Sequence, residues 1–280
     1  MIKSKTLVIS GMHRSGTSLV TQWLNRCGLF IGDHLAGPEI GNTEGLFEDT
    51  SFQQMHKQFL RKRNCSPVGF EFEALPPLDE CEKQQMLALI DDRRRNHIEW
   101  AWKDPITCLF LDEYRELIPC AFYLIVIRDY KSTVSSLVTR EHKVDMARFG
   151  AKKWISKIKW RLLKRKKLFK PFELYAEMFL KVWIHYYEEL FRHISLLPVN
   201  QYLVIDYTQL IEEDAVVFDH LKNSWQFSLN YLPFLSIYKE KMISPVESFE
   251  NYITDKNLLT TAKKIEMQLR SLSFNEVKSA

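Results

Sequence analysis

Residues 11–18 have the composition of a loop that binds a phosphate group. The loop, Gly11-Met12-His13-Arg14-Ser15-Gly16-Thr17-Ser18, follows an apolar run that ends at Ser10 and precedes a helical pattern from Leu19 to Cys27. Glycine lets the backbone approach an anion closely, and the N–H groups at the start of a helix attract negative charge. The pattern therefore predicts a nucleotide site, and the residues expected to bind are His13, Arg14, Ser15, Gly16, Thr17 and Ser18.

The loop differs from the one that ATP- and GTP-using enzymes carry. The pattern G-x-x-x-x-G-K-[ST] places a lysine directly after the second glycine, where it reaches the β- and γ-phosphates. Here that position is Thr17, and the cation is Arg14, two residues before Gly16. We therefore expect the loop to hold a different phosphorylated cofactor.

Further chemistry is expected after two other apolar runs. Arg128 ends one run, and Ser136 follows eight residues later, about two helical turns on. An arginine fork matches the shape of a phosphate, and a serine hydroxyl adds a short directional bond. We expect this pair to clamp a second phosphate group, with Lys103 adding a mobile positive charge at the same opening.

These residues need a scaffold that brings them together. Strands are expected at Thr6–Ser10, Glu99–Lys103, Ala121–Arg128 and Gln201–Asp206, and helices at Glu80–Asn96, Ser132–Arg148 and Phe172–Leu197. Strands that alternate with helices predict an α/β fold, here a P-loop-type parallel sheet flanked by helices on both faces. Ligands of such sheets bind beyond the carboxyl ends of the strands, which is where the residues named above should meet.

Length and composition predict one domain over residues 1–280, with an insertion or lid at about 141–170. Of the 280 residues, 46% are hydrophobic and 26% charged, which is enough apolar material for a core. No apolar run approaches the ~20 residues of a membrane-spanning helix, and no stretch resembles a signal peptide, so we expect a cytoplasmic protein. The five cysteines lack metal-binding spacing, so no metal site is expected.

The phosphate loop and the Arg128–Ser136 pair, in this order, resemble the sulfotransferase family. Residues 11–18 resemble the RSGT loop that binds the 5′-phosphosulfate, and Ile127-Arg128-Asp129-Tyr130 with Ser136 resembles the motif for the 3′-phosphate. Residues 42–49 and 102–105 resemble segments of the carbohydrate and bacterial branches. The KTHLP and RKG segments of the cytosolic branch are absent, and Tyr130 stands where that branch has proline. The resemblance covers about residues 7–136, and more loosely extends to 206–207.

This resemblance implies transfer of a sulfuryl group from 3′-phosphoadenosine 5′-phosphosulfate (PAPS) to a hydroxyl or amine, with a glycan or glycolipid acceptor favoured. Glu44 corresponds to the family's catalytic base, and Lys103 and Arg14 would stabilise charge on the leaving phosphate. No bridging metal is required, because a sulfuryl group carries less charge than a phosphoryl group. The other candidates for the base are Glu48, Asp49, His13 and His56.

Residues 152–170, here called the basic segment, hold ten basic residues and no acidic one, although the whole chain has a formal net charge of only +4. Helical spacing puts one set of apolar side chains on one side: Trp154, Ile155, Ile158, Leu162 and Phe169. Trp160 and Leu163 fall among the cations. The segment could be a solvated helix packed by its apolar side, a lid over the site that attracts an anionic glycan, or a surface helix on anionic lipid with Trp160 at the interface. No nucleic-acid partner is expected, since no base-reading module accompanies it.

Two other functions stay open at this point. A nucleotide-dependent kinase on the same fold would need a carboxylate for its metal, and Asp129 is the candidate, although Thr17 at the lysine position counts against a kinase. A non-catalytic nucleotide-binding module could dock on a membrane or polyanion through the basic segment. That module would leave Lys103, Arg128 and Ser136 without a role.

Overall fold

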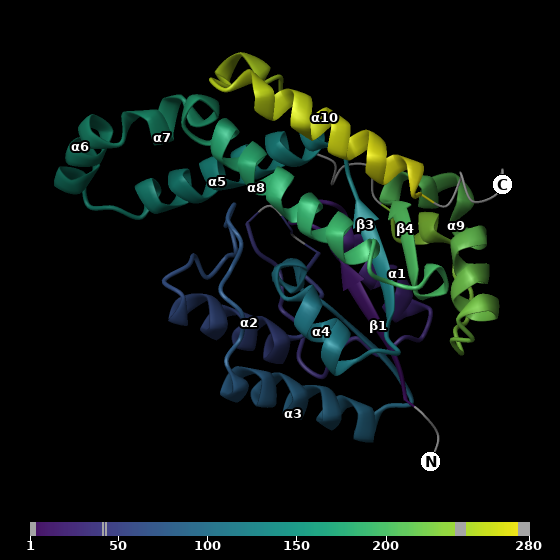
Figure 1. Ribbon diagram of the computed structural model, residues 1–280. Coiled ribbons are helices and arrows are strands. Elements are labelled where there is room, and N and C mark those ends of the chain that lie inside the picture. The colour runs from purple at the N-terminus through teal and green to yellow at the C-terminus, as the bar shows by residue number, and fades with distance from the viewer. Residues whose placement is uncertain (1–3, 41, 43, 239–244, 274–280) are drawn as a thin grey trace.

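The computed structural model describes residues 4–40, 42, 44–238 and 245–273 (Figure 1). Within these residues a parallel sheet has the order β2-β1-β3-β4. Its strands are β1 (Lys5–Ser10), β2 (Glu99–Lys103), β3 (Phe122–Ile127) and β4 (Tyr202–Asp206). The predicted α/β fold with a parallel sheet is confirmed, and each predicted strand lies within two residues of its expected bounds.

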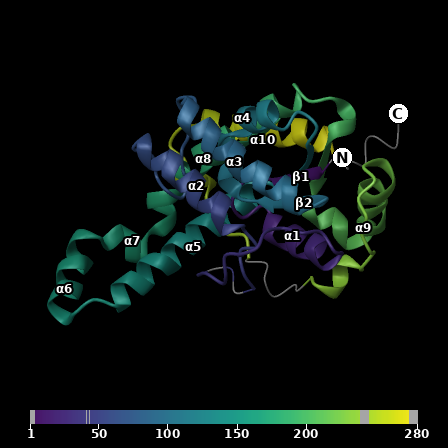
Figure 2. The ribbon, with the colours of Figure 1, turned by 90° about the horizontal axis from the view of Figure 1, so that it is seen from below.

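Helices cover both faces of the sheet. Alternate residues of the strands accordingly belong to two separate hydrophobic clusters, one on each face. One cluster joins Leu7, Ile9 and neighbouring strand residues to α1 (Thr17–Arg26) and α9 (Leu210–Asp219). The other joins Val8, Trp102 and their neighbours to the remaining long helices. Figure 2 shows α1 on one side of β1 and β2 and α10 (Lys256–Ser271) on the other. The strands are nearly continuous apolar runs, as strands buried on both faces require.

The helices take the following bounds: α1 (Thr17–Arg26), α2 (Thr50–Lys62), α3 (Glu80–Asn96), α4 (Leu111–Leu117), α5 (Tyr130–Gly150), α6 (Trp154–Leu163), α7 (Arg165–Phe169), α8 (Pro171–Ile194), α9 (Leu210–Asp219) and α10 (Lys256–Ser271). The predicted helix at 80–96 is confirmed at both ends. A capping box of Asp79 and Glu82 forms its N-terminal end. Short 3₁₀ turns include Pro105–Leu109, directly after β2. No described helix is both long and apolar enough to cross a membrane.

The basic segment forms α6 and α7, which extend from the body of the molecule between α5 and α8 (Figure 1). Its apolar stripe faces solvent: Trp154 is 75% exposed, Ile158 46% and Leu162 78%. Trp160 instead packs against Phe149 of α5, with ring centroids 6.0 Å apart. The interpretation of a helix packed by the stripe is therefore wrong for these side chains. The side chains of Ile155, Lys159 and Leu163 lie outside the described ones.

Candidate active site

The loop between β1 and α1 has the backbone geometry that its glycines predict. A Cβ at Gly11 would meet the carbonyl oxygen of Val126 at 2.5 Å, so the loop can lie against β3 only with glycine there. Gly16 has a φ of 99° and is the N-cap of α1. Glycine has no side chain that could accept hydrogen bonds from the N–H groups of the first helical turn. Those N–H groups can therefore donate hydrogen bonds to an anion.

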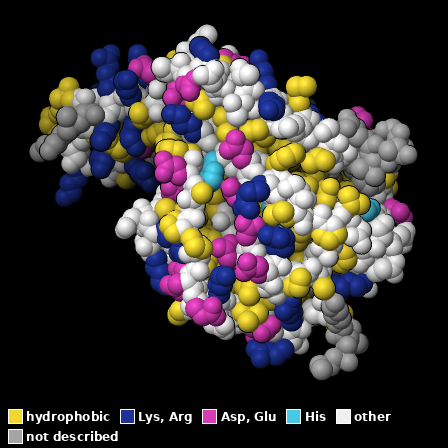
Figure 3. All heavy atoms as spheres, viewed as in Figure 1, with side chains coloured by type: hydrophobic (Ala, Val, Ile, Leu, Met, Phe, Trp, Pro, Cys, Tyr) yellow, Lys and Arg dark blue, Asp and Glu magenta, His cyan; other side chains and the backbone are white. Residues whose placement is uncertain are grey.

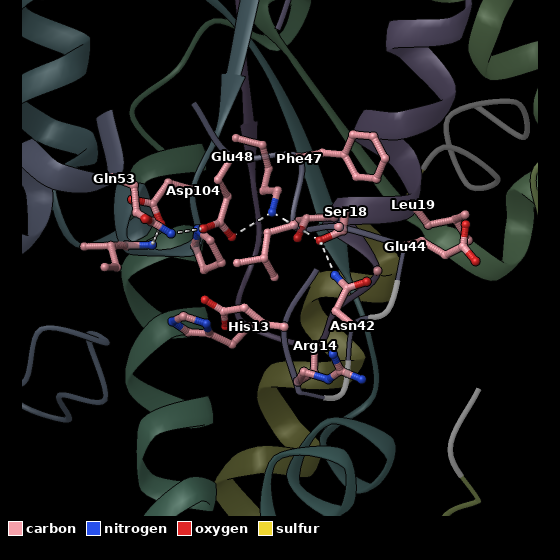
Figure 4. A pocket seen from close by; sticks show the side chains of 18 of the residues that line it. His13, Arg14, Ser18, Leu19, Asn42, Glu44, Phe47, Glu48, Gln53 and Asp104 are labelled. Carbon is pink, nitrogen blue, oxygen red and sulfur yellow. Dashed lines mark hydrogen bonds and ion pairs between the residues drawn. The ribbon is translucent and has the colours of Figure 1, made fainter. Parts of the chain in front are cut away.

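A pocket lies at the carboxyl edge of the sheet and gathers most of the predicted site residues (Figure 4). Those that line it are His13, Arg14, Gly16, Thr17, Ser18, Glu44, Lys103 and Arg128. Ser15, within the loop, is fully buried. Ser136 is joined to the group through Arg14, whose Nε donates to its Oγ at 2.9 Å. Thr43, inside the segment that carries Glu44, lies outside the described residues.

Three arginines converge on one end of this pocket. Arg128 donates from its guanidinium to the backbone oxygen of Arg14 at 3.0 Å, and Arg140 of α5 lines the same wall. Burial, together with the charges of Arg140 and Arg128, lowers the pKa of Arg14 to about 10. Clustered cations of this kind are stabilised when an anion binds between them. The sequence reading missed Arg140, although it follows Ser136 by four residues and so lies on the same side of α5.

Lys103 forms a buried ion pair with Glu48 at the other end of the pocket. The Lys103 ammonium lies 2.8 Å from Glu48 Oε1 and donates to Ser18 Oγ at 3.2 Å. Lys103 is 1% exposed and Glu48 5%. Gln53 donates to the second oxygen of Glu48 at 2.6 Å. The expectation of a mobile lysine was wrong, because Lys103 is enclosed and held by two partners beside the phosphate loop.

The two glutamates of the predicted base segment differ in their surroundings. Glu44 is exposed at the rim of the pocket, and Figure 4 shows it beside Leu19, apart from Glu48 and Gln53. Burial raises the pKa of Glu48, and the Lys103 charge opposes that rise. A carboxylate whose pKa is raised can act as a general base near neutral pH. Both glutamates line the pocket, and the buried one pairs with Lys103.

The remaining base candidates have partners of their own. Asp49 accepts from the backbone N–H of Ser51 at the start of α2 and pairs with Arg93 at 2.9 Å, so it caps and anchors that helix. His56 is fully buried, with Nδ1 2.8 Å from Asp104 Oδ2 and Nε2 2.7 Å from the hydroxyl of Tyr114. Neither Asp49 nor His56 is among the described residues that line the pocket.

His13 lines the pocket and is held in its neutral form. Burial lowers its pKa to about 3, with the positive charge of Arg140 as the next cause, so the ring is neutral at pH 7. Its Nε2 is buried and has no hydrogen-bond partner among the described atoms. The ring packs edge-on against Phe70 at 5.2 Å between centroids. His13 can therefore offer a nitrogen to a bound molecule.

Comparison with protein-family models and with curated protein sequences finds no match. Among solved structures, the chain is similar to a sulfotransferase domain from the curacin biosynthetic pathway, at 15% identity and a TM-score of 0.47, over 95% of this chain and 98% of that one. It is also similar to sulfotransferase STF1 from Mycobacterium tuberculosis (13% identity, TM-score 0.46, 96% of this chain and 77% of that one). For sulfotransferase STF9 from Mycobacterium avium the identity is 11% and the TM-score 0.49, over 95% and 76%. Similarities of this size transfer no ligand and no residue's role to this chain.

Proposed function

We propose that this chain is a sulfotransferase that takes a sulfuryl group from PAPS. The observation that supports the proposal is that two groups of residues suited to binding anions meet at one pocket. Residues 11–18 present the start of α1 to the pocket, and Arg14 reaches from this loop to Ser136, beside Arg128. A nucleotide phosphorylated at both its 5′ and 3′ positions would satisfy both groups of residues, whereas ATP has no 3′-phosphate for the second.

The proposed reaction is an in-line displacement. The acceptor oxygen or nitrogen forms a bond to sulfur while the bond from sulfur to the 5′-phosphate oxygen breaks, and 3′-phosphoadenosine 5′-phosphate (PAP) leaves. PAPS supplies the activated sulfuryl group. The chain has to orient both reactants, remove the acceptor's proton and stabilise charge on the leaving phosphate. We assign the last task to the first-turn N–H groups of α1, to Arg14 and to Lys103.

For proton removal we propose Glu48, with Glu44 and His13 as the alternatives. Glu48 is buried, and burial raises its pKa toward the range in which a base works well near neutral pH. The neighbouring Lys103 keeps the carboxylate ionised before the proton arrives. Glu44 is exposed, and the low pKa of His13 makes it a weak base. For the acceptor we propose the class that the resemblance implies, a hydroxyl or amine, with a glycan or glycolipid favoured.

The kinase alternative loses its candidate metal ligand. Asp129 is the N-cap of α5, where its carboxylate accepts from the backbone N–H of Ser132 at 2.8 Å. A cap of this kind explains the aspartate without a metal ion. Since Thr17 also stands at the lysine position, we do not propose a kinase.

Calorimetric titration with PAP and with ATP tests the proposal without knowledge of the acceptor. PAP in EDTA should bind at least ~10-fold more tightly than ATP with Mg²⁺, because one more charge-assisted phosphate contact contributes about 1.5–3 kcal/mol. PAPS incubated with the protein and candidate hydroxyl or amine acceptors should then yield PAP. Tighter binding of Mg²⁺–ATP than of PAP would refute the proposal.

A further inference from the structure

The basic segment exposes an apolar stripe that no other described element covers. Trp154, Ile158 and Leu162 recur every four residues along α6, so they lie on one side of the helix, and all three are exposed. Phe169 at the end of α7 is 60% exposed. Large apolar side chains gathered in this way on a surface mark a binding face. Figure 3 shows yellow side chains at the far end of this extension, beyond a group of dark blue ones.

The cations around the stripe are mostly not neutralised. Among the described side chains, two carboxylates form ion pairs with the basic segment. Glu173 pairs with Lys166 and Lys170, and Asp145 pairs with Lys167. No described carboxylate pairs with the other described cations: Lys152, Lys153, Lys157, Arg161, Lys164 and Arg165. Arg161 follows Trp154 by seven residues and therefore borders the stripe. The exposed apolar face thus has positive charge along its edge.

The α6 part of the segment, which carries the stripe, lies away from the pocket, whereas α7 returns along α5 as far as His142. Arg140 of α5 lines the pocket, and α5 continues for ten residues to Gly150 before the segment begins, a distance of ~15 Å along the helix. None of the described side chains of residues 152–170 is among those that line the pocket. Because no described side chain of α6 lines the pocket, the ligand of that pocket does not account for the exposed stripe.

We propose that the basic segment docks the protein on the surface of an anionic lipid bilayer. The stripe would enter the boundary between headgroups and acyl chains, with Trp154 at the interface, while Arg161 and Lys164 contact lipid phosphates. A soluble polyanion would pair with the cations but leave Trp154 and Leu162 in water. A second copy would bring two positively charged segments together. A bilayer with anionic headgroups matches both the charge and the apolar surface.

Vesicle co-sedimentation of the full chain tests this docking, using phosphatidylcholine vesicles with and without about one third phosphatidylglycerol. We expect the protein to bind to the anionic vesicles only. The partition coefficient onto these vesicles should fall at least ~10-fold for W154S/L162S and for R161E/K164E, because each double substitution removes the interfacial contacts of about two residues. Exposed sites elsewhere provide matched controls: V199S/L235S for the apolar change and K263E/K264E for the charge reversal. These controls should stay within about twofold, and all variants should keep the wild-type melting temperature.

Three results would overturn the proposal. The first is absence of binding to anionic vesicles at low salt. The second is vesicle binding that W154S/L162S retains. Binding to dextran sulfate that is as tight as binding to the vesicles, and that this variant retains, would have the same meaning, because charge alone would then explain the association. The third is a concentration-dependent dimer that W154S/L162S abolishes while vesicle binding persists, which would assign the stripe to a second copy of the chain. PAP affinity is measured in parallel and is expected to be unchanged, so failure here and failure of the sulfotransferase proposal are separable.

Discussion

Residues Lys103 and Glu48 form the pair on which the proposed chemistry depends. A buried ion pair is favourable only when further hydrogen bonds satisfy the remaining groups, and here Ser18 and Gln53 supply them. The lysine is thereby joined to the phosphate loop and the glutamate to α2. A change at Glu48 should affect turnover more than nucleotide binding, because the partners of its carboxylate are the side chains of Lys103 and Gln53, not the loop N–H groups or the arginines.

Glu48→Gln tests the role of this carboxylate as the base. The amide keeps the size and can still accept from Lys103, but it cannot take a proton, so turnover should fall by ~10²–10⁴-fold while PAP affinity survives. Glu44→Gln is the matched change in the same segment, and we expect near-normal turnover for it. The opposite pattern would place the base at Glu44, and loss of turnover in His13→Gln alone would place it at His13.

His193 gives a prediction about stability that is independent of function. It is fully buried, and burial lowers its pKa to about 4 from the ordinary value of 6.5. Between these values the unfolded chain binds a proton that the folded chain does not, so stability falls as the pH is lowered through this window. Between pH 7 and pH 5 this histidine should cost about 2 kcal/mol.

His193→Phe should therefore reduce the loss of stability in mild acid. The ring of His193 packs against Tyr123 with centroids 4.7 Å apart, and phenylalanine can keep that contact. Urea unfolding at pH 7 and pH 5 measures the two free energies for each protein. A variant that loses as much stability in acid as the wild type would contradict this assignment.

At the scale of elements, the phosphate loop is fixed by its contact with β3. Gly11→Ala should displace the loop, because the new Cβ would meet a backbone oxygen that cannot rotate away, and we expect a loss of about 1–3 kcal/mol in stability together with weaker PAP binding. Gly150→Ala at the end of α5 is the control, since nothing lies within 4 Å of a Cβ there. Denaturant melts and PAP titrations of both variants check this prediction. Equal effects of the two changes would refute it.

Elements with a strong local signal could be predicted from the sequence, and their surroundings could not. The parallel strands and the loop follow from apolar runs and glycines, which act within a few residues, and α3 begins at a capping box of equally short range. Helical spacing also grouped Trp154, Ile158 and Leu162 correctly. Spacing does not say whether another element covers a face, so the exposure of this stripe and the packing of Trp160 on Phe149 had to come from the structure.

The same limit explains what was missed in the site. Glu44 and Glu48 are four residues apart in one segment, and only the path of the chain decides which is buried. That path is set by backbone bonds from Ala36 to the Glu48 carbonyl and from Leu46 to the Ala36 carbonyl. Arg140 enters the site because α5 continues past Ser136 along the pocket wall. Both facts depend on contacts between distant residues.

At the scale of the whole molecule, charge is unevenly distributed. The chain has a net charge of +4, but the basic segment contributes ten positive charges and no negative ones, so the rest is net negative. Anions are therefore attracted to two regions, the segment and the arginine end of the pocket, and α5 connects them. A nucleotide that binds to the loop, β2 and α5 at once should stabilise the entire fold.

PAP at about 100 times its Kd should accordingly raise the unfolding free energy by about 2.7 kcal/mol. The gain should be the same in EDTA as with added Mg²⁺. Thermal melts with PAP, 5′-AMP and Mg²⁺–ATP provide the comparison. A stabilisation by PAP that required Mg²⁺ would contradict a site built only from side-chain and backbone donors.

The most direct test of a site for a 3′-phosphorylated nucleotide is a calorimetric comparison of PAP and 5′-AMP in EDTA, for the wild type and for Arg128→Ala. Because these ligands differ only in the 3′-phosphate, loss of the arginine should weaken PAP by about 1.5–3 kcal/mol and leave 5′-AMP nearly unchanged. Arg95→Ala removes an exposed arginine of α3 and should alter neither affinity. Equal losses for both nucleotides in Arg128→Ala, or equal affinities in the wild type, would contradict the account.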